Sequence, residues 1–309
     1  MWKLFILLFC FSCTDLILQD STKYNSIHLN GNAWIHIEND VNDDVNDISV
    51  MNNAFTLEFW FTGGNSGDSE SACLLSIIDA NDDIQFGIFK DPLSPNALEV
   101  WLNDERLDPI SLNLDEDLNS GSKFHHIAIT SDENIQIYLD GTKIDGCTEL
   151  DQTACEDETD FLDCVWITDH CETGELGLTY SGISISIDEN DLVIGGKVNR
   201  ELSTLANFWT GNIDEMRLWS SELNATIISF NYNNPEKLAE SYEDSYVTNL
   251  VGLWRFQFET DETSPLIPDE SCNIITQIYT NAPSICSNVG NAIIYTLGDN
   301  IVTFSEKHP

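Results

Sequence analysis

The stretch from Phe124 to Ile144 constrains the fold more strongly than any other part of the sequence. Its apolar residues recur at every second position, which is the period of half-buried strands: Ile127, Ile129, Ile135, Ile137 and Leu139. Asp140-Gly141 follows this alternation and favours a type I′ turn, because glycine adopts positive φ freely and aspartate tolerates it better than most residues. We therefore predict a β-hairpin with one face packed on a second sheet.

The same alternation recurs along the rest of the chain. Strands are predicted at Ser26–Ile37 (with Ile27, Leu29, Ile35 and Ile37 inward), Phe55–Phe61, Leu74–Ile78, Ile84–Phe89, Leu98–Leu102, Gly182–Ile187, Leu192–Gly195, Asn212–Trp219 and Leu250–Phe258. In Phe55–Phe61, the phenylalanines and Leu57 share one face, whereas Glu58 and Trp60 lie on the other. Only Ser221–Asn231 shows helical spacing. The longest stretch without a predicted strand runs from Gly146 to about Leu176, so the sequence predicts an all-β fold.

Length and charge limit what such a fold can bind. The 309 residues, 42% of them hydrophobic, suit one large all-β domain or two small ones, and we favour one. Asp and Glu total 53 against 12 Lys and Arg, a formal net charge of −41, which repels phosphate backbones and anionic lipid surfaces. We therefore expect no nucleic-acid partner and regard cations as the plausible small partners. Such an acidic surface is typical of solubility in salty or extracellular surroundings.

The N-terminus has the pattern of an export signal. Lys3 precedes an apolar run from Leu4 to Phe11, which resembles a signal-peptide core and is far shorter than the roughly 18 residues that a membrane-spanning helix needs. We expect residues 1–12 to be removed and the protein to be exported, without a transmembrane span. Ser12-Cys13 resembles a bacterial lipoprotein cleavage site, although Cys10 and Phe11 depart from that pattern. Lipidation of Cys13 would make a cell-surface lipoprotein, and its absence an extracellular protein.

The cysteines beyond Cys13 favour disulfides. An exported chain can oxidise its thiols, and four cysteines crowd into one acidic segment, separated by seven, eight and six residues: Cys147, Cys155, Cys164 and Cys171. They allow three connectivities. Zinc is the alternative, but structural zinc sites show ligand pairs two to four residues apart, which this segment lacks. Cys272 and Cys286 form a candidate third pair, and Cys73, in an apolar run, is expected to be a buried free thiol.

Six motifs in sequence order resemble the LamG-like (laminin G-like) module of the concanavalin A-like lectin/glucanase superfamily. They cover Ser26 to Phe258: Leu29-Asn30-Gly31 through Ile37, Phe55 to Trp60, Phe124 to Ala128, Ile137 to Gly141, Leu192 to Gly195, and Phe208 to Leu218. The resemblance implies two antiparallel sheets in a jelly-roll sandwich. It divides the chain into a signal peptide (1–12), an N-terminal linker (13–24), the jelly-roll domain (25–262) with a disulfide-rich loop insertion (146–176), and a C-terminal extension (263–309) packed on or following the domain.

Several residues of these motifs invite a functional interpretation that their surroundings do not support. His126 matches the family's His before Ile-Ala, but no nucleophile or acidic motif accompanies it, so we expect a packed, hydrogen-bonded histidine. Asp214-Glu215 matches a signature common among non-catalytic members and is interpreted as structural. Tryptophans in strand patterns are usually core or edge packing residues, although they could stack on sugar rings if exposed; they are Trp34, Trp60, Trp101, Trp209, Trp219 and Trp254. Trp166, in the insertion, is the better candidate for an exposed ligand-binding aromatic.

Two classes of function follow from the resemblance. The first is a non-catalytic module that recognises glycan or protein at the cell surface. The second is a glycoside hydrolase, whose superfamily members carry Glu-x-Asp-x-x-Glu on one strand. The nearest approach in this chain is Glu158 to Asp163, which ends in Asp and lies in the insertion. We therefore expect no enzyme, and no catalytic residues are assigned. A structural or adhesive surface protein differs from the first class mainly in its partner, and the oligomeric state is open.

Calcium is the one cofactor that the sequence suggests. Calcium takes six to eight oxygen ligands, and Asp82 and Asp83 lie in a turn between two predicted strands. The turn resembles the Asp-Asn-Glu turn that holds calcium in pentraxins of the same superfamily. Lys197 stands where the pentraxin site would be completed by acidic residues, so the remaining ligands would come from elsewhere. The alternative is a solvated turn without metal.

Overall fold

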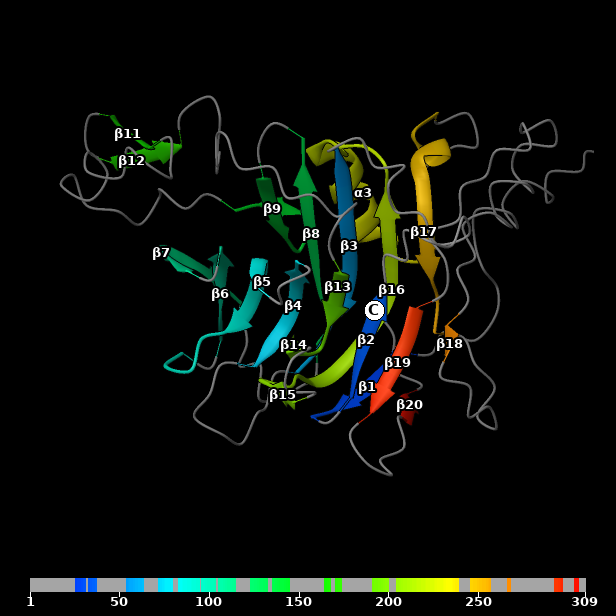
Figure 1. Cartoon of the computed structure of the whole chain (residues 1–309). Helices are drawn as coiled ribbons and strands as arrows, with labels where there is room; N and C mark the ends of the chain where they lie inside the picture. Colours follow the sequence, from blue (N-terminus) through cyan, green and yellow to red (C-terminus); the bar gives the residue numbers. More distant parts are fainter. Residues whose placement is uncertain are drawn as a thin grey trace, which may run out of the picture.

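The computed structural model describes the strands and the connections closest to them. The described residues are 26–31, 33–37, 54–63, 72–79, 83–94, 96–103, 105–114, 123–132, 135–144, 164–167, 170–173, 191–199, 204–238, 245–256, 266–267, 292–296 and 303–305. Nearly all of them lie in or beside strands of two antiparallel eight-stranded sheets. Figure 1 shows these sheets as two layers. The predicted all-β, two-sheet antiparallel fold is thereby confirmed.

The first sheet runs in the order β10-β9-β8-β3-β16-β1-β20, and β17 also pairs with β16. Its strands are β1 (Ser26–Asn30), β3 (Phe55–Phe61), β8 (His125–Ser131), β9 (Ile135–Leu139), β10 (Thr142–Lys143), β16 (Thr210–Trp219), β17 (Leu250–Trp254) and β20 (Thr303–Ser305). The long strand β16 pairs with three others, so it forms the centre of this sheet.

The second sheet runs in the order β18-β19-β2-β13-β4-β5-β6-β7. Its strands are β2 (Ala33–Ile37), β4 (Cys73–Ile78), β5 (Ile84–Lys90), β6 (Ala97–Leu102), β7 (Glu105–Asn113), β13 (Asp191–Ile194), β18 (Leu266–Ile267) and β19 (Ala292–Thr296). Two separate hairpins, β11 (Cys164–Ile167) with β12 (His170–Thr173) and β14 (Lys197–Asn199) with β15 (Thr204–Ala206), complete the described strands.

The core lies between the sheets and takes its residues from alternate positions of both. Leu57 and Phe59 of β3 contribute from the first sheet, and Ile35, Ile88 and Val100 contribute from the second. All five side chains are fully buried. Because period two sends neighbouring residues to opposite faces, the core assignment also determines which side chains lie on the two outer faces. The predicted inward residues of β1 and β2 are confirmed.

The predicted hairpin forms as expected. Ile127 pairs with Leu139 and Ile129 with Ile137 across β8 and β9. Asp140 and Gly141 both have positive φ, 49° and 74°, as a type I′ turn between β9 and β10 requires. A side chain at Gly141 would also meet the ring of Tyr232 at 2.9 Å, so this position has no room for a larger residue.

One helix covers the outer face of the first sheet. Helix α3 (Ala225–Asn233) starts and ends a few residues later than the predicted Ser221–Asn231. In Figure 1 it lies beside β3 and β16. Its residue Ile228 belongs to a second apolar cluster with Ala128 and Trp219 of the sheet. No helix in the described part of the chain is long and apolar enough to cross a membrane.

Several strands were not predicted, among them β14 and β15. The segment from Gly146 to Leu176 was expected to lack strands, but it contains β11 and β12. Strand β7 was missed because Pro109 interrupts its pattern; β7 is an edge strand, where the missing N–H of proline is tolerated. The strands β18 to β20 near the C-terminus were also missed, although β19 and β20 each pair with an N-terminal strand. Gly182–Ile187 lies outside the described residues.

Candidate functional site

Two outer faces carry the polar and aromatic side chains that could act on a partner. On the first sheet, the pleat that sends Leu57 and Phe59 into the core sends Glu58 to the outer face. Glu58 is completely buried there. An ionised carboxylate is stable without water only when charged and polar groups surround it.

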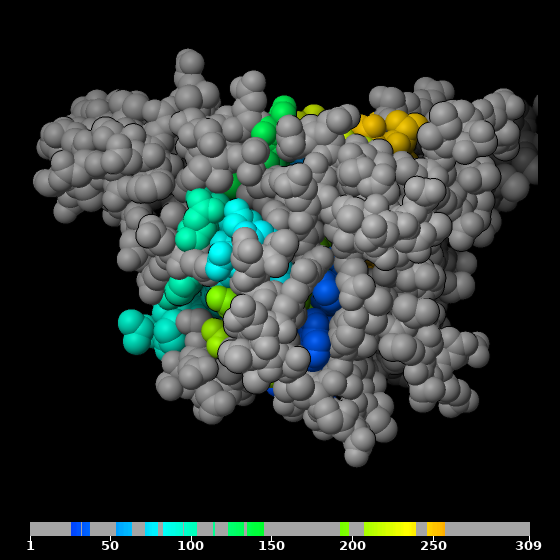
Figure 2. All heavy atoms as spheres, in the orientation of Figure 1, coloured from blue at the N-terminus to red at the C-terminus, as the bar shows by residue number. Residues whose placement is uncertain are grey.

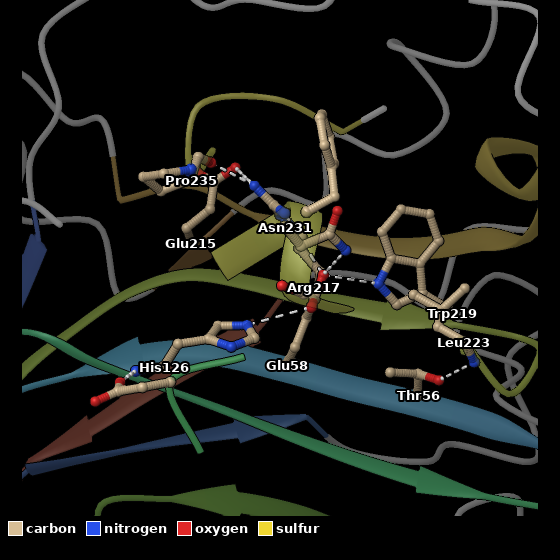
Figure 3. Close-up of polar contacts among 12 residues, drawn as sticks. Thr56, Glu58, His126, Glu215, Arg217, Trp219, Leu223, Asn231 and Pro235 are labelled. Atoms are coloured by element: carbon tan, nitrogen blue, oxygen red, sulfur yellow. Dashed lines mark hydrogen bonds and ion pairs between the residues drawn. The ribbon is translucent and has the colours of Figure 1, made fainter. Parts of the chain in front are cut away.

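Glu58 has four such partners on neighbouring elements (Figure 3). Its Oε1 accepts hydrogen bonds from Asn231 Nδ2 of α3 at 2.8 Å, Trp219 Nε1 at 3.1 Å and Arg217 Nη1 at 3.5 Å. His126 Nε2 lies 3.3 Å from Oε2, at ion-pair distance but without hydrogen-bond alignment. Burial alone raises the pKa of the Glu58 carboxyl, but His126, Arg217 and Trp219 outweigh it and hold the pKa below its usual value.

Arg217 extends this cluster toward the end of the helix. Its Nη2 donates to Glu215 Oε1 at 3.1 Å and to the carbonyl of Pro235, just after α3. Its guanidinium lies 4.9 Å from the ring centre of Trp60, in a cation–π arrangement. Glu215 also accepts from Arg255 Nε, at 3.0 and 3.2 Å to its two oxygens. Arg217 is completely buried and therefore acts as a charged link between the sheet and the helix.

A bulge in β16 places Glu215 in this cluster. The register between β16 and β3 shifts between Asp214 and Arg217, and Glu215 has φ of 47°. A bulge of this kind changes the face to which a side chain points. Asp214 Oδ1 accepts the backbone N–H of Glu215 at 2.8 Å. Burial and the neighbouring Glu215 raise the pKa of Asp214 well above its usual value, against the opposing effect of Arg255 and Arg217.

These residues form what we call the buried charge cluster: Glu58, His126, Glu215, Arg217 and Arg255. Its side chains are nearly or fully buried, and they bind one another and the helix, so the arrangement joins α3 to the first sheet. The expectation of a packed His126 is met, with ring centres 4.4 Å from Trp60 and 6.0 Å from Tyr232. In place of the predicted hydrogen bond, its Nε2 lies 3.3 Å from Glu58 Oε2 without hydrogen-bond alignment.

The outer face of the second sheet has a different character. It carries an aromatic face formed by Trp34, Phe89, Trp101 and Phe208. The ring centres of Phe89 and Trp101 lie 5.3 Å apart, and those of Trp34 and Phe208 lie 6.2 Å apart. Atoms coloured as β5 and β6 reach the surface in Figure 2. This face therefore contrasts with the closed charge cluster of the first sheet.

Trp101 is the most accessible tryptophan of the aromatic face. It is half-buried, whereas Trp34 and Phe89 are buried. Its Nε1 donates to Glu99 Oε2 at 3.2 Å, which fixes the indole on the strand. A side chain at Gly87, which pairs with Trp101 across the sheet, would meet the Phe89 ring at 2.6 Å. The glycine therefore lets the Phe89 ring lie close to the sheet beside the indole.

The sequence correctly predicted the packing tryptophans near these two faces, but it did not predict the charged residues. Trp60, Trp209, Trp219 and Trp254 are core or packing residues, as expected. Glu58, Arg217 and Arg255 were not identified from the sequence. The available signal was a carboxylate in the otherwise apolar strand Phe55–Phe61, since such a group must have a charged partner.

Several predicted sites cannot be compared with the structure. Asp82 lies outside the described residues, as do four of the cysteines: Cys147, Cys155, Cys272 and Cys286. The strands that contain Cys164, Trp166 and Cys171 are described, but their side chains are not. Cys13 is also outside. Cys73 is a buried free thiol, as predicted, and burial raises its pKa to about 12.

The predicted calcium turn is held by protein groups on its described side. Asp83 is exposed, and its N–H donates to Asp79 Oδ1 at 3.0 Å. The other oxygen of Asp79 accepts from Gln85 Nε2 at 3.4 Å. Within the described part of the chain, no group of three or more His, Cys, Asp or Glu side chains is arranged to hold a metal ion. These contacts show how Asp79 stabilises the turn.

Comparisons with solved structures return distant likenesses. A Bacteroides ovatus protein proposed to bind carbohydrate matches at 14% identity with a TM-score of 0.46, over 92% of this chain and 60% of its own. A heptameric SAP-like pentraxin of Limulus polyphemus matches at 13% identity with a TM-score of 0.35, over 69% of this chain and 77% of the pentraxin chain. A Trypanosoma rangeli sialidase mutant with trans-sialidase activity matches at 14% identity with a TM-score of 0.37, over 61% of this chain and 24% of the sialidase chain. At TM-scores below 0.5, none of these likenesses identifies a function.

The comparison with protein families is more informative. A search of curated proteins finds no match. Residues 30–162, which include β2 to β9 and the predicted hairpin, match a laminin G family model. The matched strands come from both sheets of the sandwich. On this match, residues 30–162 of the chain are similar to the concanavalin A-like lectin/glucanases superfamily.

Proposed function

We propose that the chain is an exported, non-catalytic binding module that recognises glycan or protein at the cell surface, with the aromatic face as its contact surface. The main supporting observation is the half-buried Trp101. Its indole packs beside the Phe89 ring at a tilt of 52°, and its Nε1 is held by Glu99. A partly exposed indole that is held in place offers apolar area to a partner and loses little conformational freedom on binding. Sugar rings and extended peptides both pack on such surfaces.

The glycoside hydrolase alternative requires two carboxyl groups on either side of a scissile bond. Glu58 and Glu215 are two carboxylates that share one neighbourhood, but they are buried beneath α3 and both bind Arg217. A carboxylate neutralised by a buried arginine is a poor acid, base or nucleophile. This arrangement favours the non-catalytic proposal. A structural or adhesive surface protein would use the same aromatic face with a different partner.

A binding screen of the mature protein against glycans and surface proteins tests the proposal, run with calcium and again with a chelator. Trp101→Ala should abolish the binding that the wild type shows. Tyr246→Ala is the matched control, because Tyr246 is also a half-buried aromatic but packs on Trp219 on the opposite side of the sandwich. Equal loss in both variants, or no loss in Trp101→Ala, would contradict the aromatic face as the contact surface. Release of reducing ends from a bound glycan would favour the hydrolase.

Finer parts of the proposal concern the ends and the insertion of the chain. We propose that the mature protein starts at Cys13 and carries lipid there; an intact mass that starts further downstream would leave a soluble extracellular protein. The four cysteines of the insertion (146–176) are proposed to pair with one another, as Cys272 does with Cys286. Peptide mapping without reductant checks the pairings. Finding free thiols at these positions would contradict them.

Calcium remains the proposed cofactor, with Asp82 and Asp83 as ligands. Bound calcium should raise the melting temperature as its concentration rises, because a ligand that binds only the folded state stabilises it by mass action. Calorimetric titration compares the wild type with the double variant Asp82→Asn/Asp83→Asn. If both respond equally to calcium, the ion does not bind at this turn.

A further inference from the structure

The start of α3 carries a sequence signal that neither outer face explains. Asn224-Ala225-Thr226 is the only Asn-X-Ser/Thr triplet with X other than proline in the 309 residues. Such a triplet is the acceptor sequence for asparagine-linked glycosylation in exported proteins. Asn224, Ala225 and Thr226 are all exposed. Exposure of the whole triplet is what a folded protein needs to accommodate an attached oligosaccharide.

The residues before the triplet hold it at the surface. Leu223 is buried, and its N–H donates to Thr56 Oγ1 of β3 at 2.9 Å. Thr56 Oγ1 in turn donates to the carbonyl of Ser221 at 2.9 Å. Leu223 and Ile228 belong to the same apolar cluster, in the positions of a hydrophobic staple around a helix start. The chain therefore leaves the sheet surface at a fixed point, directly before Asn224.

Asn224 caps the helix with only one of the two polar atoms of its side chain. Its Oδ1 accepts the N–H of Ile227 at 3.1 Å, with Asn224 in an extended conformation. The amide nitrogen Nδ2 takes no part in this bond. Because glycosylation modifies Nδ2 and retains the carbonyl oxygen, the same side chain can carry a sugar and cap the helix.

We infer that Asn224 is a glycosylation site that carries an asparagine-linked oligosaccharide. The donor is an oligosaccharide attached to a lipid through diphosphate, which the secretory compartment supplies. The Asn224 Nδ2–C1 bond forms, the bond between C1 and the diphosphate oxygen breaks, Nδ2 loses one proton, and the lipid diphosphate leaves. The inference rests on the export part of the proposed function, in its unlipidated, extracellular form and not in the form of a lipoprotein anchored at Cys13. No oxidant or reductant is required.

The position of Asn224 is compatible with the proposed binding surface. Helix α3 packs on the outer face of the first sheet, through Ile228 and its neighbours in the cluster with Trp219 and Leu253. The aromatic face lies on the outer side of the second sheet. An oligosaccharide on Asn224 therefore projects from the opposite side of the sandwich and leaves Trp101 accessible. Its removal should not change binding at the aromatic face.

Mass spectrometry of the native protein tests the inference directly. The peptide that contains Asn224 should carry a glycan, and treatment with an amidase specific for asparagine-linked glycans should release it and convert Asn224 to aspartate. The same peptide found entirely unmodified in the exported native protein would overturn the inference.

Variants of the full chain, expressed in a eukaryotic secretory system, separate acceptor function from folding. Thr226→Ala removes the acceptor sequence and keeps the cap, and Asn224→Ser removes the acceptor and still provides a capping oxygen. Both should lose the glycan mass completely. Thr226→Ser is the matched control and should retain glycan. Glycan retained in Asn224→Ser would place the modification elsewhere and contradict the inference.

A second set of expressions separates this inference from the proposed export. In one version the natural residues 1–12 are kept, and in the other an established cleavable leader replaces them. If the natural version stays inside the cell while the leader version is glycosylated, export by residues 1–12 fails and the acceptor assignment stands. If the leader version is secreted without glycan, the acceptor assignment fails whatever the natural N-terminus does.

Discussion

The outer faces of the two sheets differ in whether their candidate functional side chains are buried or accessible to solvent. On the first sheet, Glu58 and Arg217 are fully buried and form charged contacts with one another, and α3 covers them. On the second sheet, the corresponding surface is aromatic, and Trp101 stays partly accessible. Charged groups that are paired with one another within the protein can hold a helix in place, but they are not available to bind a partner. An accessible aromatic is available for binding.

The largest effect should come from Glu58→Gln, which removes the buried negative charge but keeps the side-chain shape. Arg217 would then lose its fully buried counter-charge, and breaking such a pair typically costs about 3–5 kcal/mol. We expect the free energy of unfolding in urea to fall by this amount. Glu222→Gln, an exposed carboxylate near the same helix, is the control and should change it by less than about 0.5 kcal/mol. A small loss in Glu58→Gln would mean that the charge cluster does not hold the helix.

The same variant should change the response to acid. The pKa of Glu58 is lowered in the folded protein, so its contribution to stability is present above the unfolded pKa of about 4.3 and is lost as pH falls through the folded value. Unfolding measured between neutral and acidic pH should show a smaller acid loss in Glu58→Gln than in the wild type. Parallel curves would contradict the lowered pKa.

A smaller effect is expected where the hairpin supports the helix. In Gly141→Ala, the new methyl group meets the Tyr232 ring, and the residue keeps a φ of 74° that alanine disfavours. The free energy of unfolding should fall by roughly 1–3 kcal/mol. Thermal denaturation measures it, with Gly196→Ala as the control, because a side chain there meets only ordinary contacts at 3.6 Å and beyond. Equal effects of the two substitutions would show that neither the contact with Tyr232 of α3 nor the positive φ restricts residue 141.

On the aromatic face, Trp101→Ala should separate binding from stability. Because the indole is only half-buried, its removal should lower the free energy of unfolding by about 1–2 kcal/mol, less than the 3–5 kcal/mol typical of a buried tryptophan. Urea unfolding gives this value, and the glycan and protein screen gives the loss of binding. A loss of stability as large as that of Glu58→Gln would make Trp101 a core residue and remove the contrast between the faces.

The last expected effect has the opposite sign, because this substitution should raise the free energy of unfolding. The folded pKa of Asp214 is raised well above its usual value, so the contribution of Asp214 to stability is fully present below the unfolded pKa of about 3.9 and is lost as pH rises through the folded value. Asp214→Asn removes this loss and should therefore raise the free energy of unfolding in urea at neutral pH. Its amide oxygen can still accept the N–H of Glu215. Destabilisation at neutral pH would show that the charged form of Asp214 is needed.

Local patterns in the sequence predicted the strands better than the site. Phe55–Phe61 alternates cleanly, so its core face followed from period two, and Asp140-Gly141 determined its own turn type. Glu215 gave no such signal, because its positive φ occurs at a bulge without glycine and depends on Arg217 and Arg255. The partial exposure of Trp101 depends on which strands lie beside it. Contacts between distant segments therefore limited what the sequence could predict.

The pairing of the two chain ends has a consequence for how the protein folds. Strand β1 pairs with β20, where Ser26 lies opposite Ser305, and β2 pairs with β19. Neither sheet can be completed until the segment that contains β19 and β20 has been synthesised. Contacts at such sequence separation slow folding, because a long loop must close before they form. Under the proposed export, a chain that crosses a membrane unfolded would gain from this late closing step, because the step delays folding.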